Sequence, residues 1–332
     1  MRAVICKELG PLENLSFEEV PTVPLLSGHI RLRVLASGVN YVDGLLIQGK
    51  YQIKPPTPFI PGMEVVGEVI ECFEDVAQTL LGQRVLANIG FGGFATEAVV
   101  RADRAIAIPD TLTTGQAASF LQSYLTGWFA LTRRAHISVE STAGKDQWML
   151  VLGAGGGVGL AAVDIGVSLG LKVIAAASSQ EKRELAVARG ASAVIDSGSE
   201  DVKERAKEIS GGGVDILYDP VGGTLGETCL RALGEDGQYL VIGFVGGIPQ
   251  LPANQILLRN RRIIGVDWGA WAGRNPQGNA ELLQEVLKKI ADKELCPVEP
   301  QVYLLSEAAT ALIDLEERRV AGKVVLVADD AK

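Results

Sequence analysis

A glycine-rich turn in the middle of the chain has the residue types and the spacing needed to bind a phosphate group. The run Ala154-Gly-Gly156-Gly-Val-Gly159 follows an apolar, strand-like segment and precedes a predicted helix. Ala154 permits the tight turn, Gly156 lets the backbone approach a pyrophosphate, and Gly159 allows the helix to pack closely on the strand. The free N–H groups and the dipole at the start of the helix, near Gly157, favour the anion. A glycine turn without a ligand is the alternative, but the strand–turn–helix context favours a dinucleotide site.

The end of the next predicted strand indicates which nicotinamide dinucleotide this turn would bind. NAD sites of this type place an Asp or Glu about 20 residues after the turn to hold the ribose 2′-OH. Here the strand ends in Ala177-Ser178-Ser179, and the cations Lys182 and Arg183 follow shortly afterwards. Hydroxyl groups and a cation suit a 2′-phosphate, which an acid would repel. The sequence therefore favours NADPH, with solvated charges on a helix surface as the alternative explanation of the two cations.

Histidine and cysteine are too few and too scattered for a zinc site of several ligands. The chain has two histidines, and its four cysteines form no Cys-x-x-Cys pair. We therefore expect no bound metal and ordinary reduced thiols. The residues concerned are His29, His136, Cys6, Cys72, Cys229 and Cys296.

Composition and charge argue against nucleic acid and membranes as partners. The 332 residues are 47% hydrophobic and carry a net charge of −9, whereas nucleic acid and anionic membranes favour a basic face. Glu8 interrupts the start where a signal peptide would be apolar. The most apolar stretch, 148–177, contains Asp164, Lys172 and many glycines, which do not suit a membrane span. We expect a cytoplasmic protein.

Two regions of the chain differ in their pattern of predicted elements. Up to about residue 120, short strands such as 30–34, 64–70 and 84–87 are separated by proline-rich turns, which predicts a small β domain. Farther on, strands alternate with helices, which predicts βαβ units and a parallel sheet covered on both faces, an α/β fold. The strands predicted there are 148–152, 172–177, 193–195, 214–218 and 239–242, and the helices are 122–133, 157–169, 181–189 (ended by Gly190) and 280–293. A last short strand is predicted at 323–327.

Short motifs along nearly the whole chain resemble the medium-chain dehydrogenase/reductase superfamily, in particular its zinc-free quinone oxidoreductase branch. They include Gly38-Val-Asn40-Tyr-Val-Asp43, Gly49-Lys-Tyr51, Pro61-Gly-Met-Glu64, Asp219-Pro-Val-Gly-Gly223 and Gly322-Lys-Val-Val-Leu326, in addition to the glycine turn. The resemblance implies a doubly wound Rossmann sheet inserted into a GroES-like β-rich catalytic domain. The catalytic domain would comprise residues 1–122 and 297–332, and the dinucleotide-binding domain residues 123–296. It also implies a homodimer that pairs the edges of the Rossmann sheets.

The chain differs from the zinc-dependent relatives at the positions of their metal ligands. Those relatives have a cysteine where this chain has Val39 or Asn40, and Gly-His-Glu where it has Gly62-Met63-Glu64. Their four-cysteine lobe is also absent. Methionine and asparagine do not replace imidazole and thiolate as zinc ligands, so the resemblance implies a zinc-independent protein.

The resemblance also assigns roles to individual residues. Asn40 would lie beside the nicotinamide, Asp43 would order that loop, and Tyr51 would line the substrate cleft; these three form the predicted catalytic group. Ser197 stands where many NADPH-binding members have a tyrosine, which weakens the NADPH assignment, and Arg259 stands where relatives often have lysine. The residues predicted to border the cofactor are Asn40, Thr126, Ala154, Gly156, Gly157, Val158, Gly159, Ser178, Ser179, Lys182, Gly243, Phe244 and Trp268.

Most of these residues also have a purely structural explanation. Asn40 and Asp43 are residue types that cap and close turns. Tyr51 and Trp268 could be ordinary packing residues, like Trp271. For Glu64 we favour the role of a structural hydrogen-bond acceptor.

The reaction expected from these residues is the reduction of a quinone or an α,β-unsaturated carbonyl with NADPH. Without a metal, a simple carbonyl is difficult to polarise, whereas a conjugated acceptor spreads charge onto an oxygen that one amide or hydroxyl can stabilise. Asn40 would orient the nicotinamide or the acceptor, and Tyr51 or a water would supply the proton. The alternatives are an enoyl or alkenal reductase, including one for enoyl thioesters, and a non-catalytic NADPH-binding protein.

Overall fold

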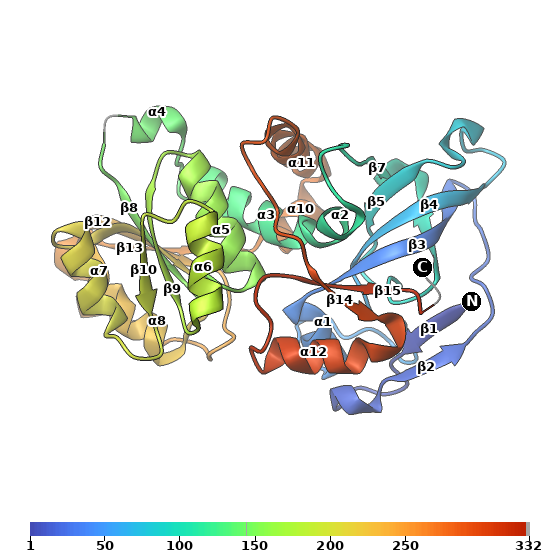
Figure 1. Ribbon diagram of the computed structural model, residues 1–332, viewed down its shortest axis with the longest axis horizontal. Helices are drawn as coiled ribbons and strands as arrows, with labels where there is room; N and C mark the ends of the chain where they lie inside the picture. The colour runs from blue at the N-terminus through green and yellow to red at the C-terminus, as the bar shows by residue number, and fades with distance from the viewer. Residues whose placement is uncertain (144, 330–332) are drawn as a thin grey trace. The chain divides into compact units, whose positions relative to one another are not determined.

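The computed structural model describes residues 1–143 and 145–329. The chain forms two compact units (Figure 1). Unit 1 combines Met1–Gln122 with Val298–Lys332, and unit 2 comprises Ser123–Pro297.

A seven-stranded sheet forms the centre of unit 1. Its order is β14-β15-β3-β4-β5-β7, and β6 pairs with β3 beside this path. The strands are β3 (His29–Val39), β4 (Glu64–Cys72), β5 (Arg84–Asn88), β6 (Glu97–Arg101), β7 (Ile106–Ala107), β14 (Gln301–Leu304) and β15 (Val324–Val327). β15 pairs antiparallel with β3, so a strand near the end of the chain completes the sheet begun by its first part. A separate pair, β1 (Arg2–Ile5) and β2 (Ser16–Glu19), lies beside it.

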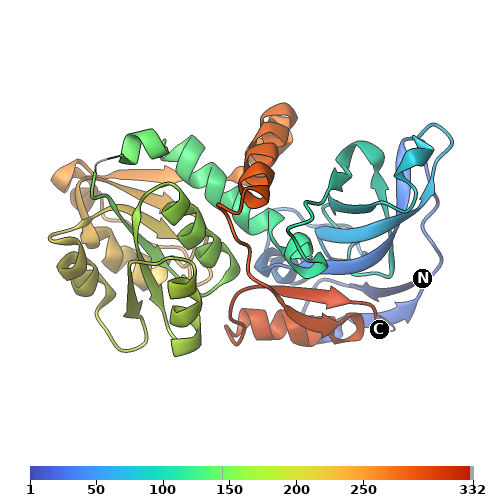
Figure 2. The same ribbon diagram turned by 45° about the horizontal axis from the view of Figure 1, so that its top comes forward.

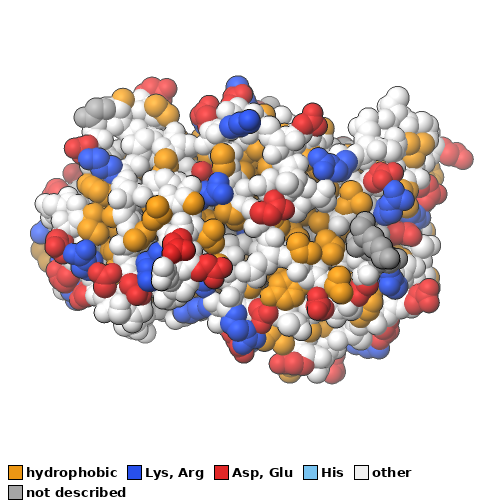
Figure 3. All heavy atoms as spheres, viewed as in Figure 1, with side chains coloured by type: hydrophobic (Ala, Val, Ile, Leu, Met, Phe, Trp, Pro, Cys, Tyr) orange, Lys and Arg blue, Asp and Glu red, His pale blue; other side chains and the backbone are white. Residues whose placement is uncertain are grey.

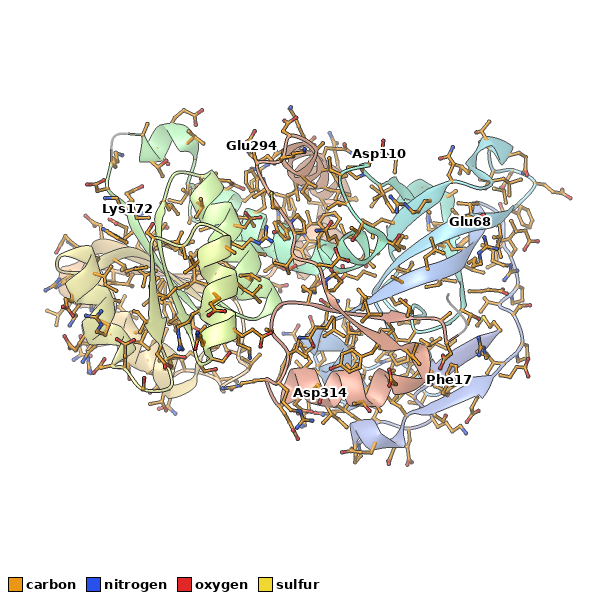
Figure 4. The ribbon with its side chains drawn as sticks, viewed as in Figure 1. Phe17, Glu68, Asp110, Lys172, Glu294 and Asp314 are labelled. Atoms are coloured by element: carbon orange, nitrogen blue, oxygen red, sulfur yellow. The ribbon has the colours of Figure 1, made fainter. Side chains whose placement is uncertain are left out.

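Alternating apolar residues explain why these strands pack. In β3, Ile30, Leu32 and Val34 point to one face and join Val65 and Val69 of β4 in a buried cluster. The helices of unit 1 are α1 (Tyr41–Ile47), α2 (Thr114–Ser119) and α12 (Ala308–Glu316). Figure 4 labels Asp314 on α12, whose carboxylate accepts a hydrogen bond of 2.8 Å from the Tyr303 hydroxyl on β14.

Unit 2 contains a six-stranded, fully parallel sheet in the order β10-β9-β8-β11-β12-β13. The strands are β8 (Trp148–Leu152), β9 (Lys172–Ala177), β10 (Ala193–Asp196), β11 (Val214–Asp219), β12 (Leu233–Val241) and β13 (Arg262–Gly265). This is the strand order of a Rossmann fold, with β8 as its first strand. The chain reverses its direction of winding between β8 and β11, and ligands of such sheets bind at that point.

Helices cover both faces of the parallel sheet, as Figures 1 and 2 show. α5 packs beside α6, and α7 packs beside α8. The helices of this region are α3 (Leu121–Trp128), α4 (Val139–Thr142), α5 (Gly157–Ser168), α6 (Gln180–Ala188), α7 (Val202–Ser210), α8 (Gly223–Cys229), α9 (Ala253–Leu257), α10 (Trp268–Arg274) and α11 (Pro276–Ala291). The predicted α/β class and the covered parallel sheet are confirmed.

The predicted helix 122–133 is only partly α-helical. α3 ends at Trp128, and Phe129–Arg134 form a π-helical turn. The Thr132 hydroxyl donates to the Trp128 carbonyl (2.6 Å), and the Ala135 N–H reaches the carbonyl of Ala130, five residues back. Competition of this kind for backbone carbonyls widens a helix, and apolar periodicity does not reveal it.

Within the described part of the chain, no helix combines the length and apolar character that crossing a bilayer requires. On the face drawn in Figure 3, acidic and basic side chains are intermingled, without a continuous basic patch.

The four cysteines are free thiols, of which Cys6 and Cys229 are buried.

Candidate functional site

The glycine turn of unit 2 connects β8 to α5 and is as tight as its sequence predicts. Gly153 has a φ of +58°, and its carbonyl accepts the N–H of Gly156 at 3.0 Å. A Cβ on Gly159 would collide with the Gly153 carbonyl oxygen and lie 2.9 Å from Cα of Ala154. Gly159 therefore permits the contact between helix and strand, which is the role predicted for it. Ala154 is buried, and its N–H donates to the Ala176 carbonyl of β9.

The N-terminus of α5 fits a phosphate group. Gly156 is the N-cap, is exposed, and provides no side chain to accept the first N–H groups of the helix. A Cβ on Gly156 would have only the Gly153 carbonyl oxygen nearby, at 3.6 Å, so the space in front of the helix is open. The N–H groups of Gly157, Val158 and Gly159 begin the helix there and, with the dipole, favour an anion.

The two cations after β9 have different surroundings. Arg183 donates to the Ala177 carbonyl (3.1 Å) and pairs with Asp196 (3.1 Å), so it stabilises the ends of β9 and β10. The stem of Lys182 lies against the glycine turn, because a Cβ on Gly155 would collide with it and come within 2.8 Å of its Cδ. Lys182 therefore lies beside the glycine turn.

The two serines at the end of β9 also differ. Ser178 is exposed, whereas Ser179 is the N-cap of α6 and accepts the N–H of Lys182. The structure thus gives Ser179 a local structural role and leaves Ser178 as the hydroxyl at the surface.

The other predicted cofactor residues are spread over unit 2. Thr126 is half-buried in α3, Gly243 follows β12, and Phe244 is exposed beside it. Because β8, β11 and β12 run parallel, the segments after their ends share the edge of the sheet where the glycine turn lies. Trp268 is buried at the start of α10 and donates from its indole nitrogen to Asn279 at 2.9 Å, which favours the packing explanation for this residue.

The loop after β11 is held by a buried carboxylate. Asp219 accepts the N–H groups of Val221 (2.7 Å) and Gly222 (2.8 Å) and the hydroxyl proton of Tyr239. Burial raises the pKa of the Asp219 carboxyl, and these three donors oppose that effect. This network fixes the backbone of the Asp219-Pro-Val-Gly-Gly223 motif at the same edge of the sheet.

Unit 1 contains a buried polar cluster at the predicted catalytic asparagine. Asn40 Nδ2 donates to Glu64 Oε1 at 2.9 Å, and Asn40 Oδ1 accepts from Lys323 Nζ at 2.7 Å. Lys323 Nζ also lies 3.8 Å from Glu64 Oε1. The other Glu64 oxygen accepts the backbone N–H of Gln122 at 3.2 Å. All three polar side chains are buried.

Asp43 completes this cluster from the first turn of α1. Its carboxylate accepts the backbone N–H of Asn40 at 2.8 Å, so Asp43 closes the helix start while the Asn40 side chain is free to bind elsewhere. Burial raises the pKa of the Asp43 carboxyl to about 7; the Asn40 N–H opposes the rise, and Glu64 reinforces it. Burial also lowers the pKa of the Lys323 ammonium, and the carboxylates of Glu64 and Asp43 oppose this.

Comparison with known proteins agrees with this arrangement. Residues 27–110 match the family model "Alcohol dehydrogenase GroES-like domain", and residues 157–288 match "Zinc-binding dehydrogenase". Quinone oxidoreductase-like protein 2 of Bos taurus is 35% identical over 328 residues, which cover 98% of this chain and 92% of the bovine protein. The chain belongs to the quinone oxidoreductase-like branch of the medium-chain dehydrogenase/reductase superfamily.

Solved structures of quinone oxidoreductases resemble this protein over nearly its whole length. The quinone oxidoreductase of Thermus thermophilus, solved with and without NADPH, is 32% identical with a TM-score of 0.83, over 98% of this chain and 100% of that chain. The Escherichia coli quinone oxidoreductase complexed with NADPH is 26% identical with a TM-score of 0.86, over 98% and 100%. The protein is accordingly an oxidoreductase that binds a nicotinamide cofactor.

One member of the polar cluster of unit 1 was not predicted from the sequence. Lys323 entered only as part of the motif Gly322-Lys-Val-Val-Leu326, although a cation directly before an apolar strand is an available signal of a buried partner. Glu64 was expected to be a structural acceptor, and it does accept hydrogen bonds.

Tyr51 is half-buried in the segment after α1. Among the described residues, no three His, Cys, Asp or Glu side chains are grouped so that they could hold a metal ion.

Proposed function

We propose that this medium-chain reductase is a zinc-independent NADPH:quinone oxidoreductase, which also accepts other conjugated carbonyl compounds. The observation that carries the proposal is the buried Asn40 amide, which is held by Glu64 and Lys323. Zinc-dependent relatives have a cysteine ligand where this chain has Val39 or Asn40. An amide donor is sufficient for an acceptor whose added charge spreads over a conjugated system. With a simple alcohol or aldehyde as substrate, by contrast, an amide donor polarises the reacting group much less than a metal ion does.

The glycine turn and Lys182 support NADPH as the reductant. When bound, NADPH supplies the hydride that this reduction needs. The N–H groups of Gly157, Val158 and Gly159 would donate to its pyrophosphate. Lys182 would pair with the 2′-phosphate, and the exposed Ser178 hydroxyl would add a hydrogen bond.

The residues of unit 1 would act on the acceptor. Asn40 would donate an N–H to the acceptor oxygen as negative charge develops on it. Tyr51 or a water would transfer a proton to that oxygen, so that a quinone leaves as the hydroquinone. An enal or an enoyl thioester would be reduced by the same residues, with the proton delivered to carbon.

An acceptor screen with NADPH and NADH side by side tests this proposal. We expect quinones to be reduced faster than enals and enoyl thioesters, NADPH to be preferred, and a chelator to leave the rate unchanged. Asn40→Ala should lower kcat with the best quinone about 100-fold, as the loss of one oxyanion donor does elsewhere. Asn14→Ala, an exposed asparagine of the same unit, is the matched control and should behave like the wild type.

Other outcomes of this screen identify the alternatives. Faster turnover of enals or enoyl thioesters would make the protein an enoyl reductase. Tight NADPH binding with background oxidation for every acceptor would make it a non-catalytic NADPH-binding protein. Loss of activity with a chelator, restored by zinc, would refute metal independence.

We also propose a homodimer formed through the edge of the parallel sheet. β13 is the last strand of that sheet, and an exposed edge can pair with another chain. The segment before it exposes Leu257 (78%) and Leu258 (56%), and Ile248 is 78% exposed. Leu257→Asp should therefore shift the mass in solution from dimer to monomer, whereas Val187→Asp, at an exposed site on α6, should not. A monomeric wild-type protein would contradict this.

A further inference from the structure

We propose that Lys323 is a positioning residue for acceptor reduction: it locks Asn40 as a hydrogen-bond donor and places a positive charge one amide group away from the acceptor oxygen. The inference deepens the proposed function and rests on it. It assigns a role to a lysine that is 283 positions away from Asn40 in the sequence.

The first step of the argument is the orientation of the Asn40 amide. Its Oδ1 faces the Lys323 ammonium at 2.7 Å, and its Nδ2 faces the Glu64 carboxylate at 2.9 Å. A flipped amide would place N–H groups against the ammonium and its oxygen against the carboxylate, and both contacts would be repulsive. The two charged neighbours therefore fix a single orientation.

This orientation determines what Asn40 can offer a ligand. Its oxygen is used by Lys323, and one of its two Nδ2 protons is used by Glu64. One N–H remains for a further acceptor, and none of the hydrogen bonds found among the described residues uses it. Asn40 can thus offer an N–H to the acceptor oxygen, which is what a developing oxyanion requires.

The second step is the placement of Lys323 by the sheet. Lys323 immediately precedes β15, Asn40 immediately follows β3, and Glu64 is the first residue of β4. β15 pairs antiparallel with β3 with Val324 opposite Val39, and β3 pairs antiparallel with β4 with Gly38 opposite Glu64. The register of three adjacent strands therefore brings these side chains to one place, and no loop movement is needed to assemble them.

The third step is electrostatic. The side chains of Lys323 and Glu64 are 9% and 1% exposed, so solvent screens their charges weakly. The carboxylates that face the Lys323 ammonium are Glu64 on β4 and Asp43 on α1. An ammonium bound to the amide oxygen draws electron density from the amide, which makes the remaining N–H a stronger donor.

A purely structural explanation is that the ion pair only fastens β15 to β3 and β4. The two explanations predict different pH dependences of the rate when Lys323 is replaced by arginine. A guanidinium keeps its charge at all accessible pH values, whereas the burial of Lys323 lowers the pKa of its ammonium. Only the proposed role makes the rate depend on that charge.

The experiment compares Lys323→Arg with the double variant Glu64→Gln/Lys323→Met in the full-length protein. The double variant removes both charges together, because a single Lys323→Met would leave the buried Glu64 unpaired and could unfold the protein. With a quinone and NADPH, we expect kcat of the double variant to fall at least about tenfold, with KM for NADPH within about twofold. Lys323→Arg should retain most of the wild-type kcat.

The pH dependence of kcat distinguishes the two explanations, because a purely structural role would not make it differ between the wild type and Lys323→Arg. Wild-type kcat should fall on the alkaline side as Lys323 loses its proton, and the Lys323→Arg profile should stay flat there. Equal kcat values for the wild type and a folded double variant would overturn the proposal. Identical alkaline limbs for the wild type and Lys323→Arg would also overturn it.

A spectroscopic measurement keeps this test separate from the proposed function. With asparagine labelled by nitrogen-15, the Asn40 side-chain amide is identified as the resonance lost in Asn40→Ala. We expect that resonance to move in the double variant and, in the wild type, to titrate at alkaline pH. If the wild type reduces no acceptor, the proposed function fails, and this signal still decides whether Lys323 controls the amide. An Asn40 resonance that is insensitive to both changes would refute the positioning role.

Discussion

Replacing Gly156 with alanine should separate phosphate binding from folding in this protein. Gly156 has φ −88° and ψ 164°, a conformation open to alanine, and its new Cβ would have only the Gly153 carbonyl oxygen within reach, at 3.6 Å. Such a change stabilises a protein by about 0.4–1 kcal/mol, because it restricts the unfolded chain. We therefore expect the apoprotein to melt at the wild-type temperature or slightly above it.

The same methyl group would occupy the exposed position in front of α5, where the pyrophosphate is proposed to bind. Its bulk would keep the phosphate oxygens from the N–H groups of Gly157 and Val158. Each hydrogen bond to a charged group that is lost costs about 1.5–3 kcal/mol. Loss of one such bond therefore corresponds to roughly a 10-fold to 100-fold rise in the Kd for NADPH.

Gly159→Ala serves as the comparison for Gly156→Ala, because the new Cβ at position 159 would collide with backbone atoms. The carbonyl carbon of Gly153 would lie 2.8 Å away and Cα of Ala154 2.9 Å away, and neither can rotate aside. Forcing atoms into a packed region costs about 1–3 kcal/mol, so this variant should lose thermal stability. NADPH fluorescence titration and thermal unfolding of the apoproteins measure the two effects. Wild-type NADPH affinity in Gly156→Ala, or a wild-type melting temperature in Gly159→Ala, would refute this reasoning.

Three further predictions concern cofactor preference and stability. Gly155→Ala should displace Lys182 and reduce the kcat/KM preference for NADPH over NADH about tenfold; an unchanged ratio would show that Lys182 does not set the preference. Because burial raises the pKa of Asp43 from 3.8 to about 7, the wild-type free energy of unfolding should fall relative to Asp43→Asn as pH rises through that range. The full difference is about 4 kcal/mol, measurable by urea unfolding at each pH, and parallel pH curves would contradict it. Tyr239→Phe should lower the free energy of unfolding by about 1–3 kcal/mol, because the buried Asp219 carboxylate loses a donor; an unchanged midpoint in urea would show that this bond contributes nothing.

The parallel sheet and the glycine turn could be predicted from the sequence because their signals are local. The apolar runs 148–152 and 172–177 are β8 and β9 residue for residue. Gly190 has a φ of +87° after α6, as expected for a left-handed cap. Each of these features depends on residues that are close together in the chain.

The distinction between Lys182 and Arg183 could not be predicted. Adjacent residues on a helix point about 100° apart, so one of two neighbouring cations can face the turn while the other faces a different strand. Arg183 meets Asp196 at the end of β10, and only the order of the strands brings that carboxylate close. Composition and spacing contain no information about that partner.

The polar cluster was only partly predictable, for the same reason. Asn40 and Asp43 are three positions apart, and their hydrogen bond was foreseeable from turn chemistry. Lys323 and Asn40 are 283 positions apart and meet only because β15 pairs with β3 in one particular register. Nothing local to Lys323 specifies that register.

The pairing of β15 with β3 also sets an order of events on the ribosome. The middle of the chain, which contains every strand of the parallel sheet, is synthesised before β14 and β15 exist. Unit 2 can therefore fold while the first strands of unit 1 still lack their last neighbour. A chain terminated before Lys323 would retain the glycine turn but lack the ammonium that binds Asn40. It would also leave the end of β3 without its neighbour β15, as an open sheet edge.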